Sequence, residues 1–281
     1  MPTFDTPEPI SVTIDLPLGD VRMRAGDGDV TVVDVRPSDA SNREDLEAAE
    51  QTRVEYENER LLVRAPKLRS WLSRSGGGSI DVTIELPAGS HVNGAMGSAN
   101  FHSDGRLGDC RIKTGIGHIR LDRADTLNLK SGAGDVSADR VTGQADVTAG
   151  SGDVRLHELD SSAVIKNSNG DTWVGVANGD LRLKAANGNI AVDLAHATVG
   201  AKCANGDIRL SDVARGSVVL ETRVGDLEVG IREGTAAWLD VSATAGKVHN
   251  ALEAVDTPDP SAETVEVRAR TTLGEIVIRR P

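Results

Sequence analysis

Hydrophobic and polar residues alternate with a period of two along short segments of this chain, and the segments recur at a fixed spacing. The stretch SNGDTWVGVANGDLRLKAANGNI, residues 168–190, contains alternating runs such as Leu181-Arg182-Leu183-Lys184 between Asn-Gly turns. This alternation is typical of half-buried β-strands. The Gly of each turn tolerates the positive φ that a tight corner needs. The pattern therefore predicts many short strands joined by corners.

A spacing of 18 residues relates these corners to one another. The corners are Gly134-Asp135-Val136, Gly152-Asp153-Val154, Gly170-Asp171-Thr172, Gly188-Asn189-Ile190 and Gly206-Asp207-Ile208. Apolar positions keep the same phase, and the column seven residues after each Gly holds Val141, Leu159, Ala177, Ala195 and Val213. A strict period of this kind is the signature of a solenoid. We expect an all-β fold, a single-stranded β-helix with about 18 residues per coil and two or three strands in each coil.

The repeat extends beyond these five corners. Gly117 precedes the series, and Gly225, Gly246 and Gly274 follow it with longer insertions. One coil buries about six small apolar side chains at roughly 1–3 kcal/mol each, which is less than the entropic cost of about 1–2 kcal/mol for ordering each residue. Several coils with protected ends are therefore required. The Pro281 terminus and an N-terminal cap are expected to protect the two ends.

The N-terminal part has a mixed pattern. The strand-like segments SVTIDLPLGDV (residues 11–21) and DVTIELPAGSHV (residues 81–92) resemble each other and suggest an internal duplication. Residues 38–51 have the composition of a helix that begins at a Ser38 cap, and residues 54–65 predict a hairpin that turns at Glu57-Asn58-Glu59. We expect a β-rich cap with one short helix over residues 1–79 and the β-helix repeat domain over 80–281.

A basic, Gly-rich segment, KLRSWLSRSGGGS, follows the hairpin over residues 67–79. It is the one stretch that concentrates basic and aromatic side chains. Such a segment is either a plain surface loop or a docking loop, for an acidic partner or for the chain's own acidic corner. Its candidate partner-binding residues are Lys67, Arg69, Trp71 and Arg74.

Composition narrows the partners and the compartment. Aromatic residues make up 2% of the 281 residues, so the core must be built from small aliphatic side chains. The net charge of −12 argues against nucleic acid and against anionic membranes as partners. No secretory signal precedes Ser11, and no apolar run is long enough to span a membrane. We expect a cytoplasmic protein without membrane insertion, with export by another route left open.

Candidate chemistry is sparse. The chain contains none of the GxSxG, GxxxxGK[ST], GxGxxG or HExxH motifs, and Cys203 stands in a column of small residues where a buried side chain is wanted. We therefore expect no enzyme activity and no cofactor. The weak candidates for a metal site are the corner carboxylates, which should form a row: Asp135, Asp153, Asp171, Asp207 and Asp226. Turn amides are expected to bond these carboxylates, with calcium binding as the alternative.

The turns SGAGDV, AGSGDV, NSNGDT, AANGNI and CANGDI, together with strand ends of the form LPxG, resemble those of the putative-adhesin family of bacterial β-strand-repeat proteins. That resemblance implies a β-helix of unknown function and transfers no catalytic residue. We expect a non-catalytic binding or scaffold protein with a protein partner. The alternatives are a self-assembling element that resembles bactofilins, which leaves homo-oligomers open, and a calcium-binding adhesin of the β-roll type.

Overall fold

The computed structural model describes residues 1–66, 77–253 and 263–281. The chain divides into two compact units, residues 1–139 and residues 140–281. The expected all-β fold is confirmed, because 23 strands and a single helix account for the regular structure of the described residues. Among these residues no helix has the length and apolar content that a membrane crossing requires. The boundary predicted at 79/80 is a different division of the chain and stays a prediction.

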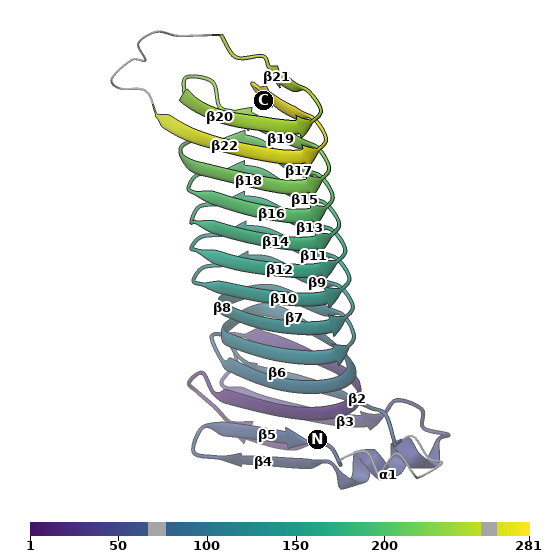
Figure 1. Cartoon of the computed structure of the whole chain (residues 1–281). Coiled ribbons are helices and arrows are strands. Elements are labelled where there is room, and N and C mark those ends of the chain that lie inside the picture. Colours follow the sequence, from purple (N-terminus) through teal and green to yellow (C-terminus); the bar gives the residue numbers. More distant parts are fainter. Residues whose placement is uncertain (67–76, 254–262) are drawn as a thin grey trace. The chain divides into compact units, whose positions relative to one another are not determined.

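Each regular coil of the second unit contributes two strands, as Figure 1 shows. One run of parallel strands comprises β10 (Ala145–Ser151), β12 (Ala163–Asn169), β14 (Leu181–Asn187), β16 (Val199–Asn205) and β18 (Gly216–Val224). The other comprises β11 (Val154–Leu159), β13 (Thr172–Ala177), β15 (Ile190–Ala195), β17 (Ile208–Val213) and β19 (Leu227–Ile231).

Residues 18 apart are direct neighbours on adjacent strands, as the period predicts. Thr172 pairs with Val154 on one side and with Ile190 on the other. The column seven residues after the corner Gly is buried throughout, from Val141 to Val213. Alternating side chains point into the solenoid and pack on their own equivalents, coil after coil. The predicted columns are therefore confirmed as the core of the second unit.

The last two coils do not stack in sequence order. β22 (Thr264–Leu273) lies between β18 and β20 (Ala236–Ala245), and β23 (Ile276–Arg279) lies between β19 and β21 (Val248–Asn250). Burial follows this order: Val267 and Ala269 of β22 are fully buried, whereas Leu239 and Val241 of β20 stay half-exposed. The expectation that the Pro281 terminus protects this end is wrong, because residues 236–250 form the outermost coil.

The first unit is built on long strands that run around the corners. It contains β1 (Thr3–Asp5), β2 (Ser11–Gly26), β3 (Val30–Pro37), α1 (Arg43–Gln51), β4 (Arg53–Glu57), β5 (Arg60–Arg64), β6 (Ile80–Pro87), β7 (His91–Ile116) and β8 (Ile119–Ala133), while β9 (Val136–Val141) spans the division. β2 pairs in parallel with β7, Ser11 opposite His91, and β7 pairs in parallel with β8. The antiparallel pairs β4–β5, β1–β3 and β3–β6 complete this unit.

The predicted hairpin and helix are both present in the first unit. Asn58 and Glu59 have φ values of 51° and 59°, which is the geometry of a two-residue hairpin turn between β4 and β5. The helix begins five residues later than predicted, and its cap is Asn42, whose Oδ1 accepts the backbone N–H of Glu44 at 2.9 Å. Ser38 instead bonds to Ser79 and Asp81. The predicted Ser38 cap is wrong because this hydroxyl is held by the residues around β6.

Candidate functional site

The corner residues of the second unit form a ladder of hydrogen bonds between side chain and backbone. In each rung an Oδ1 atom accepts the backbone N–H of the equivalent residue one coil further along. The rungs are Asp153 to Asp171 at 3.0 Å, Asp171 to Asn189 at 2.8 Å, Asn189 to Asp207 at 2.9 Å, Asp207 to Asp226 at 2.8 Å and Asp226 to Glu275 at 2.7 Å. The last rung reaches Glu275 because the coil that contains Glu275 and β23 is the one stacked directly on β19.

The first unit has its own version of this ladder. The backbone N–H of His118 bonds to Oδ1 of Asn100 at 2.9 Å, and the backbone N–H of Asp135 bonds to Nδ1 of His118 at 3.1 Å. A neutral imidazole accepts through that nitrogen. Asn, His and Asp therefore serve the same purpose, which is to satisfy the amide that follows a corner Gly.

This geometry bears on the calcium alternative. The structure brings the metal candidates Asp153, Asp171, Asp207 and Asp226 into one row, with Asn189 interrupting it, while Asp135 belongs to the other unit. Every Oδ1 of the row already accepts an amide N–H. The described residues contain no group of three or more His, Cys, Asp or Glu side chains placed to hold a metal ion. The row can therefore align amides at the corner, and its oxygens do not converge on one point.

A second column, made of buried polar side chains, lies inside the corner and is not evident from the sequence. Three residues before the corner Gly, a buried polar side chain donates to the carbonyl of a neighbouring corner. Examples are Thr222 Oγ1 to Gly206 O at 3.0 Å, Thr271 Oγ1 to Gly225 O at 3.0 Å and Cys203 Sγ to Gly188 O at 3.3 Å. Cys203 is 7% exposed, and burial raises the pKa of its thiol, which confirms it as a core residue.

The predicted partner-binding residues Lys67, Arg69, Trp71 and Arg74 lie outside the described residues. The docking-loop hypothesis for them stays a prediction.

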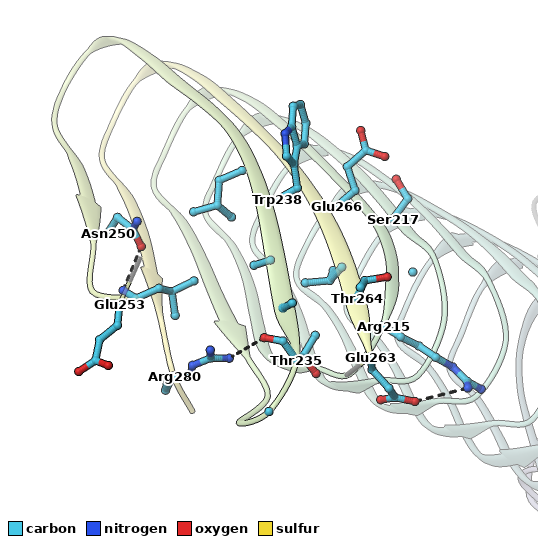
Figure 2. Close-up of a pocket in the computed structure, with 17 residues that line it drawn as sticks. Arg215, Ser217, Thr235, Trp238, Asn250, Glu253, Glu263, Thr264, Glu266 and Arg280 are labelled. Atoms are coloured by element: carbon cyan, nitrogen blue, oxygen red, sulfur yellow. Dashed lines mark hydrogen bonds and ion pairs between the residues drawn. The ribbon is translucent and has the colours of Figure 1, made fainter. Parts of the chain in front are cut away.

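The outermost coil of the second unit surrounds a hollow of about 1300 Å³. Figure 2 shows its wall, with Trp238 of β20 beside Glu266 of β22, and Glu253 on the segment that follows β21. The Trp238 side chain is 56% exposed, and the Arg268 guanidinium lies 5.9 Å from its ring centroid. The hollow thus combines an exposed aromatic ring with carboxylates.

Two arginines of this hollow are already engaged. Arg215 lies 3.5 Å from a carboxylate oxygen of Glu263. Nη1 of Arg280 donates to the backbone carbonyls of Ile231, Arg232 and Thr235 at 3.1, 2.6 and 3.2 Å. These three hydrogen bonds fasten the end of the chain to the turn that leads into the outermost coil.

β20 is the edge strand of this coil. Within the described part of the chain it pairs only with β22, so one row of its backbone groups has no strand partner. The bond from the Ala236 N–H to the Glu263 carbonyl fixes which groups face β22. Because backbone groups alternate along a strand, the N–H groups of Ala237, Leu239, Val241 and Ala243 face the open side. These groups are the donors that an added strand requires.

Comparisons with known proteins identify a family for the sequence but no specific activity. Residues 9–267 match the family model Toastrack DUF4097. A solved putative adhesin from Parabacteroides merdae is 9% identical, with 100% of this chain and 95% of that chain covered and a TM-score of 0.45. A putative adhesin from Bacteroides fragilis is 13% identical, with 99% and 95% covered and a TM-score of 0.36. No curated protein matches the sequence.

Proposed function

The chain belongs to the Toastrack DUF4097 family, and on that premise we propose that it is a non-catalytic, adhesin-like binding protein with a protein partner. Membership confirms the family resemblance that the repeated turns indicate. The proposed binding surface is the open side of β20 together with the hollow beside it. There an extended segment of the partner adds as one more strand, a recognised mode of peptide binding.

The contrast between two edge strands carries this proposal. Natural proteins protect edge strands with charges, Pro or bulges. β4, an edge strand of the first unit, has the sequence RVEYE, with three charges in five residues. β20 has the sequence AAWLDVSATA, with Asp240 as its only charge, and Asp240 is held by Arg270 at 3.3 Å. A ten-residue edge without such protection is suited to pairing.

Charge indicates what kind of segment pairs there. Several charged residues that line the hollow are engaged: Arg215 pairs with Glu263, Glu266 pairs with Arg268 at 2.6 Å, and Arg280 bonds to backbone carbonyls. Among the described lining residues this leaves the Glu253 carboxylate. A partner segment with one apolar side chain against Trp238 and one basic side chain near Glu253 complements this surface.

The test is a selection of peptides from a random display library on the whole protein. Ala243→Pro removes one outward N–H from the edge and leaves the pairing with β22 intact. Ala243→Ser keeps that N–H and is the matched control. We expect peptides that bind the wild-type protein and the Ala243→Ser variant, and that bind Ala243→Pro at least about tenfold more weakly, the cost of one lost hydrogen bond.

Hydrogen exchange locates the bound peptide. A peptide on the edge protects amides within residues 236–245. Peptides that bind both variants equally, or that protect other segments, contradict the proposal. Light scattering of the protein alone separates the self-assembly alternative, which predicts filaments or large species, from a binding protein of discrete size.

A further inference from the structure

A column of lysines stands on the outer face of the second unit. Lys166, Lys184 and Lys202 occupy the same position in three successive coils, four residues before the corner Gly, and they are direct register partners on β12, β14 and β16. All three side chains are exposed. Arg182, on the same face of β14, lies beside Gly200 of β16 and adds a fourth positive charge.

Like charges directly opposite each other on neighbouring strands are destabilising. Lys202 is offset by Glu221, whose carboxylate lies 2.7 Å from its Nζ. The described residues offer no ion-pair partner to Lys166 or Lys184. The next position of the column, on β18, is Glu221. The chain has 43 acidic residues against 31 basic ones, and yet the three successive positions on β12, β14 and β16 are all lysines.

The first unit also has a pair of neighbouring lysines at this repeat position. Lys113 of β7 and Lys130 of β8 are register partners and are exposed, and each stands four residues before its own corner Gly. Repulsion retained at one repeat position in both units indicates a use for the charge.

We propose that the lysine column of β12, β14 and β16 binds a linear acidic polysaccharide that runs along the stack of coils. The backbones of neighbouring lysines are about 4.8 Å apart, the strand spacing, so the column presents positive charge in a line. A flexible chain of acidic sugars presents carboxylates or sulfates in a line as well, and basic clusters of this kind bind such polymers.

Other anions fit less well. An extended acidic peptide repeats its same-face carboxylates about every 6.6 Å, which does not match the rungs. Single-stranded nucleic acid binds by stacking its bases on aromatic rings, and the sequences AVIKNSN, LRLKAAN and VGAKCAN of the three strands contain none.

The test measures binding of fluorescein-labelled heparin and polygalacturonate oligosaccharides by fluorescence anisotropy at low salt. The variant Lys166→Gln/Lys184→Gln removes two column charges. The control Arg155→Gln/Arg209→Gln removes two exposed charges from the other run of strands, β11 and β17, where they pair with Asp153 and Glu228. We expect the lysine variant to bind one or both polymers roughly tenfold more weakly, and the control to bind them like the wild-type protein. Added salt should weaken wild-type binding steeply.

The proposal is overturned if neither polysaccharide binds, if both double variants weaken binding equally, or if polyphosphate or a DNA oligonucleotide of equal charge binds more tightly. Unfolding midpoints show whether the variants fold, and loss of like-charge repulsion should leave the lysine variant at least as stable as the wild-type protein. The β20 edge is a separate surface, so Ala243→Pro should bind both polysaccharides normally.

Discussion

The Oδ1 atom of Asp171 accepts the backbone N–H of Asn189 at 2.8 Å, one coil further along the solenoid. This relationship repeats along the corner, so each side chain satisfies a backbone group of the next coil. Adjacent carboxylates about 4.8 Å apart repel by near 1 kcal/mol in water, and a charge-assisted bond to an amide offsets this cost. The corner ladder therefore ties the coils together on one side.

Removing one acceptor from the ladder should destabilise the protein. Asp171→Ala leaves the Asn189 N–H without its partner, and we expect the free energy of unfolding to fall by about 1–2 kcal/mol in urea titrations. Asp171→Asn keeps an amide oxygen in place, as Asn189 does naturally, and should change stability by less than about 0.5 kcal/mol. Equal losses in the two variants would show that charge, and not the acceptor, matters at this corner.

The corner glycines should not tolerate a side chain. Gly188 has a φ of 123°, and a Cβ there would stand 2.2 Å from the carbonyl oxygen of Gly170. Gly188→Ala is expected to cost about 3 kcal/mol or more. Gly200 is the matched control, because a Cβ there meets no atom closer than 3.9 Å. Gly200→Ala should be neutral or slightly stabilising in the same unfolding assay, and a reversed order of the two would contradict the corner geometry.

The repeat could be predicted because the same kind of residue recurs at the same position in many coils. A strict spacing places Val136 and its equivalents on one inward line, whereas the alternation and the corner glycines leave two or three strands per coil open. The lysine column was also readable, since Lys166, Lys184 and Lys202 each stand four residues before a corner Gly.

The order of the last coils was not predictable from spacing. β18, β20 and β22 share the same alternation and end at the same kind of corner, so any stacking order satisfies the repeat. In the structure Val267 of the inner strand β22 is buried, whereas Leu239 of the outer strand β20 stays half-exposed. The open edge at β20, and hence the proposed binding surface, follows from this stacking order.

Arg280 should hold the outermost coil through its three carbonyl acceptors. Arg280→Ala removes these bonds, and we expect amides in residues 232–245 to exchange faster by roughly tenfold or more. Arg280→Lys keeps the charge but not the planar fork, and should give an intermediate effect. Unchanged exchange in Arg280→Ala would show that strand pairing with β22 alone fixes this coil.

The thiol of Cys110 should be inert in the folded protein. Burial raises its pKa to about 12, chiefly by desolvation, so almost no thiolate forms near neutral pH. We expect iodoacetamide at pH 8 to modify Cys110 only after unfolding, as peptide mass spectrometry would show. Because the folded pKa lies above the unfolded value of about 8.5, this thiol contributes stability below that pH and loses it as pH rises toward 12. Rapid modification of the folded protein would contradict its burial.

The central claim is that residues one repeat apart stack as rungs, with the C-terminal coil inserted before the outermost one. Pairs of spin labels test it directly, in a background with Cys110 and Cys203 replaced by Ala. From Asp146, the register leads through successive partners to Val219, then to Arg268 and then to Asp240. Pulsed electron resonance should give Cα-level separations of about 19, 24 and 29 Å for the three pairs, one strand spacing per rung. A shorter distance to Asp240 than to Arg268, or distances that do not increase by rungs, would contradict the account.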